Sequence, residues 1–250
     1  MIDLDNNVKY IKGVGPNRVE SLNKLGIFTL KDLITYYPRD YEDRSKPKSL
    51  LECIDGEEAL IEVIAISKMI ESKFSRKTMQ KIMIRDNTSS AEAIWFNQTY
   101  LKSKFTVGKK YRMYGKIEKK YGKIIIASPV FDEYGSTQNT GRIIPIYPLT
   151  YQLSQNTLRK IIENAMNEVY GNLPETLPQY IIKTNRILGI NDAIKTIHFP
   201  QELKDFKIAR KRLVFEELLI TQLSLMSLKN RDVLEEKGIK FSSEYKIEDF

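Results

Sequence analysis

Hydrophobic residues in the centre of the chain fall at every second position in five short runs, which is the spacing of a β-strand with one buried face. Residues 97–105, between the third and fourth runs, are enough for one short helix. Five short antiparallel strands with a helix after the third are the layout of an OB-fold, a closed barrel that commonly binds single-stranded nucleic acid. Gly108 and Gly115 stand where barrel strands must start or bend. The five runs cover residues 59–67, 79–85, 91–96, 109–118 and 123–130.

Hydrophobic residues at helical spacing lie on both sides of this barrel. Residues 8–36 predict two short helices joined by a tight turn, with Pro16 at the first helical position and Thr29 capping the second helix. After the barrel, Ser154 is predicted to cap a helix that runs to Tyr170. A long helix over residues 205–230 has more than one apolar stripe, so we expect it to pack against several partners.

These patterns together predict an α+β fold. A five-stranded OB-fold barrel is preceded by a small helical hairpin and followed by helical segments that include one long helix. The hairpin and a polar connector occupy residues 1–58, and the barrel occupies residues 59–134. An extended linker with short helices occupies residues 135–204, and the long helix with the start of a further linker occupies residues 205–250.

Three aromatic residues stand at and just beyond the end of the third predicted strand. Trp95 and Phe96 are adjacent, so their rings point to opposite faces of the strand and cannot both enter one core. Tyr100 follows Phe96 by four residues and shares a side with it if a short helix starts at Asn97. Two interpretations remain open: the rings close the end of the core, or they form an exposed platform on which bases stack.

Positive charge is concentrated in the same segment. Residues 59–134 contain fifteen Lys and Arg against seven Asp and Glu, an excess equal to the formal net charge of +8 of the whole chain. The pI near 9.3 therefore reflects the predicted barrel. Cations near turns and strand ends suit a phosphate backbone, and rings set among them are typical of a groove for single strands. The candidate phosphate contacts are Arg76, Lys77, Lys102, Lys104, Lys119, Lys120 and Lys123.

The turn before the first helix is a second candidate site. Gly13-Val14-Gly15 directly before a helix is the pattern of helix-hairpin-helix modules, in which exposed backbone N–H groups of Gly13 and Gly15 can receive a phosphate. The alternative is a purely structural hairpin that packs on its neighbour.

Several kinds of chemistry are disfavoured by the sequence. Cys53 is the only cysteine and His198 the only histidine, which excludes an internal disulfide and Cys/His zinc sites, and we expect His198 to be structural. No phosphate-binding loop of the GxxxxGK[ST] type is present. We therefore predict no catalytic residue, no metal site and no cofactor in this chain. Neither a secretion signal nor a membrane span is recognisable, so a cytoplasmic protein without membrane contact is expected.

Motifs along nearly the whole chain resemble, in order, the amino-terminal region of the RecG family of ATP-dependent branched-DNA helicases. The similarity begins with Gly13-Val14-Gly15-Pro16 and with Pro38-Arg39-Asp40-Tyr41-Glu42-Asp43-Arg44-Ser45. It continues through Trp95-Phe96-Asn97 and Pro145-Ile146-Tyr147-Pro148-Leu149-Thr150. It ends with His198-Phe199-Pro200 and with Ala209-Arg210-Lys211-Arg212-Leu213-Val214-Phe215-Glu216-Glu217-Leu218-Leu219.

This resemblance implies that the barrel is a wedge placed at the junction of a replication fork. Carried over by position, Phe96 and Tyr100 are the pair that stacks on bases, with Trp95 in the neighbouring ring position. The expected partners are branched DNA, such as forks and four-way junctions, and the protein's own C-terminal helicase domains, which would bind ATP and Mg²⁺. The resemblance further implies a bacterial cytoplasmic protein at the nucleoid, and we expect a monomer.

Two other readings of the sequence stay open. One is a stand-alone OB-fold module that binds single-stranded DNA or RNA. The other is an enzyme that uses carboxylates such as Asp132 and Glu133, for which the sequence offers no paired site.

Overall fold

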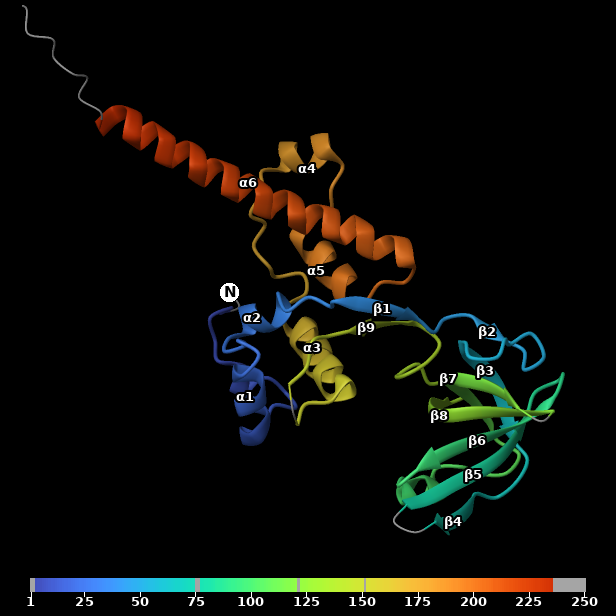
Figure 1. Cartoon of the computed structure of the whole chain (residues 1–250). Coiled ribbons are helices and arrows are strands. Elements are labelled where there is room, and N and C mark those ends of the chain that lie inside the picture. The colour runs from blue at the N-terminus through green and yellow to red at the C-terminus, as the bar shows by residue number, and fades with distance from the viewer. Residues whose placement is uncertain (1–2, 75–76, 121, 151, 236–250) are drawn as a thin grey trace, which may run out of the picture.

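The protein consists of a helical module and a barrel, joined by a two-stranded ribbon (Figure 1). The structure is a computed structural model and describes residues 3–74, 77–120, 122–150 and 152–235. Each of the two parts has its own cluster of buried hydrophobic side chains. The predicted α+β class is confirmed.

The barrel contains the five predicted strands and two more. Its strand order is β2-β3-β7-β8-β6-β5-β4, and a pairing between β3 and β5 closes it. Among the five predicted strands, β6 and β8 form a parallel pair, so the prediction of antiparallel strands throughout was wrong at that pair. The short β2 also pairs parallel with β3. Alternation predicts which side chains face the core, but it does not identify a strand's neighbour or its direction. The strands are β2 (Pro47–Lys48), β3 (Glu58–Ala65), β4 (Ile70–Phe74), β5 (Lys77–Arg85), β6 (Ser90–Phe96), β7 (Lys110–Lys120) and β8 (Lys123–Glu133).

The bend expected at Gly115 is present in β7. The β7–β8 register shifts between Tyr114 and Lys116, which marks a bulge. A Cβ atom at Gly115 would lie 3.0 Å from Cα of Pro129 on β8, so that the backbone of β8 would have to shift to make room. Glycine at this position therefore allows the two strands to approach where the barrel curves.

The helical module brings the beginning and the later part of the chain into one core. Side chains from the N-terminal helices and from residues 147–194 share that core, so the segments predicted as 1–58 and 135–204 pack together. Pro16 starts the first helix and Thr29 caps the second, as predicted, and Ser154 Oγ accepts a hydrogen bond from Thr157 N at 3.2 Å. The helices are η1 (Val8–Tyr10), α1 (Pro16–Asn23), α2 (Leu30–Ile34), α3 (Gln155–Val169), α4 (Gln179–Asn185), α5 (Ile190–His198) and α6 (Leu203–Glu235). Within the described residues, none of the helices combines the length and apolar character that a membrane crossing requires.

The ribbon joins two segments that lie a hundred residues apart in the sequence. β1 (Asp40–Asp43) pairs antiparallel with β9 (Ile143–Ile146) (Figure 1). The sequence analysis predicted only a polar connector after the N-terminal helices and so missed β1. The sequence of this strand, DYED, has no alternation of polar and apolar residues that would indicate a strand. Arg44 follows β1, pairs with Glu42 and donates to the carbonyl oxygen of Asn139 at 2.9 Å.

His198 has a structural role, as predicted. It ends α5 and is fully buried, with Nε2 2.8 Å from the carbonyl oxygen of Ile34 and Nδ1 2.8 Å from the hydroxyl of Tyr147. Because a carbonyl can only accept, Nε2 carries the proton and Nδ1 accepts from Tyr147. Burial lowers the pKa of His198 to about 4.

Acid is therefore expected to destabilise the protein through His198. Between pH 6.5 and 4 the unfolded state binds a proton at His198 that the folded state does not, so stability falls as pH decreases. A shift from 6.5 to about 4 corresponds to roughly 3 kcal/mol. Urea unfolding across this range should show the slope in the wild-type chain and a smaller one in His198→Gln. Equal slopes in both proteins would contradict the assignment.

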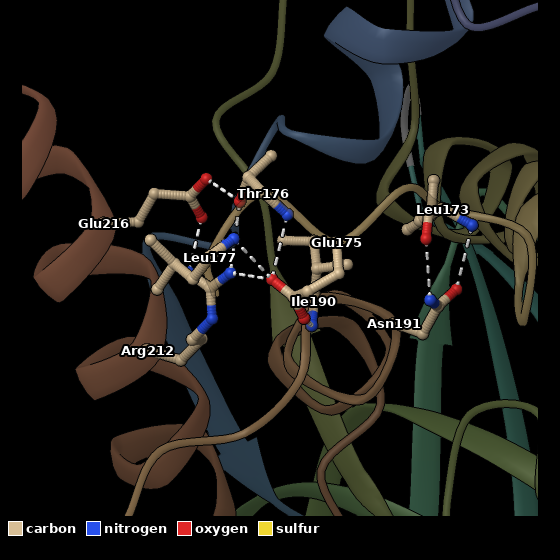
Figure 2. Close-up of polar contacts among 8 residues, drawn as sticks. All are labelled: Leu173, Glu175, Thr176, Leu177, Ile190, Asn191, Arg212 and Glu216. Atoms are coloured by element: carbon tan, nitrogen blue, oxygen red, sulfur yellow. Dashed lines mark hydrogen bonds and ion pairs between the residues drawn. The ribbon is translucent and has the colours of Figure 1, made fainter. Parts of the chain in front are cut away.

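One buried arginine fastens α6 to the rest of the helical module (Figure 2). Arg212 is fully buried, and its Nη2 and Nη1 atoms contact Glu175 Oε1 at 2.7 Å and Glu216 Oε2 at 2.5 Å. Glu175 also accepts hydrogen bonds from the backbone N–H groups of Leu177 and Ile190. The contacts lower the pKa of the Glu175 carboxyl against the opposing effect of its burial.

Candidate nucleic-acid interface

The pleat of β6 separates two of the three candidate rings. Trp95 points into the barrel and is 1% exposed, whereas Phe96 points outward and is 51% exposed. Tyr100 lies in the short helix η2 (Thr99–Ser103) and is 64% exposed. The two outer rings are therefore available to a ligand, and the core interpretation is wrong for them.

Trp95 is a core residue, so its prediction as part of the DNA-binding surface is corrected. Its Nε1 donates to the carbonyl oxygen of Pro129 at 2.8 Å, and its ring packs against Phe105 and Phe131. The side chain faces inward because Ala91 and Ala93, at the alternate positions of the same strand, face the core as well.

A network of amide side chains positions Tyr100 beside the end of β6. Asn97 has φ 55° and reverses the chain, and its Oδ1 accepts a hydrogen bond from Thr78 N on β5 at 3.0 Å. The buried Gln80 accepts from Gln98 N at 3.0 Å, and Gln98 in turn accepts from the Tyr100 hydroxyl at 3.0 Å. The sequence analysis missed these positioning residues. The tolerance of asparagine for positive φ was the one available signal.

Three of the predicted cations lie at the same end of the barrel as the exposed rings. Lys77 starts β5, whose Met79 pairs with Phe96, while Lys102 and Lys104 belong to η2 and the residue after it. All three are exposed, and none forms an ion pair with another residue that the structure describes. Their charge is therefore available to phosphate groups. Arg76 lies outside the described residues.

The other three predicted cations belong to the turn end of the β7–β8 hairpin, at the opposite end of the barrel. The β6–β8 register places Lys123 level with Ser90, which is roughly 20 Å from Phe96 at about 3.3 Å per residue. Lys120 forms an ion pair with Glu118 at 2.7 Å, and Lys119 donates to the carbonyl oxygen of Leu51. The structure therefore does not combine Lys119, Lys120 and Lys123 with the rings in one local site.

The Gly13–Gly15 turn packs on α3. Asn164 Nδ2 donates to the carbonyl oxygen of Lys12 at 2.6 Å, and Arg18 Nη1 donates to that of Gly13 at 2.5 Å. Gly13 has φ 95°, a backbone conformation that favours glycine, and Gly15 is the N-cap of α1. These contacts explain the turn as a structural hairpin, and phosphate binding by its N–H groups stays a prediction.

Of the two candidate carboxylates, Asp132 has a structural role and Glu133 lies at the surface beside a lysine. Asp132 accepts hydrogen bonds from the backbone N–H groups of Asn139 and Thr140, at 2.7 and 2.8 Å, and so closes the loop after β8. Glu133 lies 3.6 Å from Lys109. In the part of the chain that the structure describes, no three His, Cys, Asp or Glu side chains gather where they could hold a metal ion.

Comparisons with known proteins agree with this architecture. The family model described as the RecG wedge domain matches residues 7–169. The ATP-dependent DNA helicase RecG of Thermotoga maritima is 36% identical over 236 residues, covering 91% of this chain and 30% of the helicase. The corresponding helicase of Streptococcus pneumoniae is 29% identical and covers 95% of this chain and 35% of the helicase. The chain thus spans about a third of the length of these curated relatives.

A solved structure gives the same result in three dimensions. The structure of RecG bound to a three-way DNA junction superposes with a TM-score of 0.84 and 34% sequence identity. It covers 92% of this chain, and this chain covers 32% of it.

The fold and the exposed rings define an OB-fold wedge domain with flanking helices. The family match over residues 7–169 identifies it further: the chain belongs to the RecG wedge domain family.

Proposed function

We propose that this chain is the DNA-binding wedge region of an ATP-dependent helicase that acts on replication forks and four-way junctions. The observation that carries the proposal is the exposed pair Phe96 and Tyr100 at one end of the barrel. Beside them lie lysines that form no ion pair with any residue the structure describes. Aromatic faces accept unpaired bases of any sequence, and the lysines attract the backbone of the same strand. The relatives named as RecG helicases, and the junction-bound structure, support this assignment.

In this proposal the barrel supplies no bond-making chemistry. A motor outside the chain pulls duplex DNA against the barrel, and the two strands separate where Phe96 and Tyr100 stand. Stacking of the freed bases on the two rings offsets part of the unpairing cost of a few kcal/mol. The nascent arms, stripped from their templates, can then anneal to each other, which regresses the fork.

The motor would belong to the same polypeptide, in helicase domains that follow α6. Those domains would bind ATP and Mg²⁺ and hydrolyse the nucleotide, and this chain alone would have no helicase activity. The protein would act as a monomer at forks in the bacterial cytoplasm.

A gel-shift series tests the DNA preference. The 250-residue chain is titrated against a fork, a four-way junction, duplex DNA and a single strand of equal length. We expect the two branched substrates to bind more tightly than the duplex and the single strand. Equal affinity for plain single strands and forks would favour the alternative function, a stand-alone OB-fold module for single-stranded DNA or RNA.

Fork binding is expected to weaken steeply with salt. If about five phosphates are neutralised, the log-log slope of affinity against salt concentration is roughly −4 or steeper. Replacing Lys102 and Lys104 by Gln should make that slope shallower by about 2, since each lysine releases one counterion. Lys183→Gln with Lys207→Gln, which removes two exposed lysines of α4 and α6 outside the barrel, serves as the charge-matched control. A flat salt dependence of the wild-type chain would contradict the role of the lysines.

A further inference from the structure

A cavity lies where the helical module meets the loop after β8. Its volume is about 570 Å³, and it is lined by the N-terminal turn, by residues 137–142 and by the first turns of α3. Neither β5, β6 nor η2 contributes a residue to its lining, so the cavity is separate from Phe96 and Tyr100. The charged side chains of its lining, together with one amide from α3, are Arg18, Arg142, Asn156, Arg159, Lys160 and Glu163.

The lining of this cavity carries an excess of positive charge. Four of the lining side chains are cationic and one is a carboxylate, Glu163, which is engaged by Lys160 at 2.7 Å. Arg142 and Arg159 donate only to neutral acceptors, the carbonyl oxygens of Gln138 and Gln155 and the amide oxygen of Asn156. Among the described residues neither guanidinium has a carboxylate partner.

Two guanidinium N–H groups in this lining lack an acceptor. Arg159 is 8% exposed, and its Nη1 has no hydrogen-bond partner among the described residues. The same is true of Nε of Arg142. A buried charged donor without an acceptor is unfavourable, so an acceptor group that enters the cavity would be bound favourably by these atoms.

The electrostatic state of Arg159 agrees with this. Burial, together with the neighbouring positive charges of Arg44 and Arg142, lowers its pKa to about 10. The positive end of the α3 dipole adds to the same field, because Asn156 and Thr157 of its first turn line the cavity. An anion in the cavity would remove the repulsion among these groups.

We propose that this cavity binds a phosphate group, with Arg142 and Arg159 as its principal ligands. Guanidinium groups match the oxygen geometry of phosphate and donate two parallel hydrogen bonds. The cavity volume lies in the range of small-molecule sites, so a nucleoside phosphate fits as well as one phosphate of a DNA backbone. Gly13 borders the cavity, which places the predicted glycine turn at its edge.

Titration of the 250-residue chain with inorganic phosphate at constant ionic strength tests the site. We expect a saturable rise in melting temperature, together with shifts of the ¹⁵N-labelled Nε signals of Arg142 and Arg159. Arg142→Gln should raise the phosphate Kd at least tenfold, and Arg210→Gln, an exposed arginine of α6, should leave it unchanged. No saturable response in the wild-type chain, or wild-type affinity in Arg142→Gln, would overturn the proposal.

The buried Arg159 needs a second variant, since its loss could impair folding. Arg159→Lys keeps the charge but not the paired donors, so it should fold and still bind phosphate more weakly. Wild-type affinity in a folded Arg159→Lys would refute the role of the guanidinium group.

Competition distinguishes the two sources of phosphate. If the ligand is a DNA backbone, fork DNA displaces inorganic phosphate and Arg142→Gln weakens fork binding. If it is a nucleotide, ADP binds at least tenfold more tightly than phosphate and fork DNA does not compete. The site is independent of the proposed fork contact, because Phe96→Ala with Tyr100→Ala should retain phosphate binding in either case.

Discussion

Replacing Phe96 and Tyr100 together by alanine is expected to raise the Kd for forked DNA about thirtyfold or more. Removal of one stacking ring costs about 1–3 kcal/mol, so the pair should cost at least about 2 kcal/mol. Both rings are more than half exposed, at 51% and 64%, and their loss removes little buried surface. The melting temperature should therefore stay close to that of the wild-type chain. Fluorescence anisotropy with a labelled fork and a thermal melt measure the two quantities.

The chain offers a matched control for this double substitution. Phe28 and Tyr10 are exposed by 51% and 66% and lie on the N-terminal part of the helical module. Phe28→Ala with Tyr10→Ala removes the same two ring types from a surface outside the barrel and should leave fork binding unchanged. If both double variants weakened binding equally, the rings of the barrel would have no special role. A large loss of stability in Phe96→Ala with Tyr100→Ala would mean that these rings support the core.

Replacing Arg212 by leucine is expected to lower the free energy of unfolding by about 3–5 kcal/mol. The substitution leaves Glu175 and Glu216 partly buried without their cation, and removing one member of a buried ion pair has a cost of this size. Without the ion pairs of Arg212, the packing of α6 on α5 should also become looser (Figure 2). Urea denaturation measures the change in unfolding free energy.

Arg210→Leu is the control for the Arg212 substitution. Arg210 lies two residues earlier on the same helix and is exposed, so its replacement should change stability by less than about 0.5 kcal/mol. The wild-type cluster should also weaken in acid, because the pKa of Glu175 is lowered in the folded state and its stabilising contribution is lost as pH falls through that pKa. Equal effects of Arg210→Leu and Arg212→Leu would show that the buried cluster does not stabilise α6.

Elements with strong local signals were predicted well from the sequence. The apolar stripe of α3 and the caps at Pro16, Thr29 and Ser154 depend on residues within one or two helical turns. The five main barrel strands alternate clearly because one face of each is buried in the barrel core. Strands β1, β2 and β4 were missed, because short polar edge strands have no alternation and form only when a partner strand is beside them.

The candidate site was predicted only in part. The sequence placed rings and cations in one segment, yet the register separates Lys119, Lys120 and Lys123 from Phe96 by about the length of a strand. No local pattern indicated that Arg142 and Arg159, seventeen positions apart, line one cavity. That proximity depends on how the loop after β8 folds against α3.

The sequence by itself determined the family, the order of the main helices and of the five main barrel strands, the concentration of positive charge in the barrel, and the fact that Trp95 and Phe96 face opposite sides. These properties follow from residue identity and from the two- and 3.6-residue periods of local structure. Only the tertiary structure decided which ring is buried, which lysines lie beside the exposed rings, and which groups pair with His198 and Arg212. Burial and pairing are set by residues distant in the sequence, such as Pro129 for Trp95 and Glu175 for Arg212, and no local pattern contains that information.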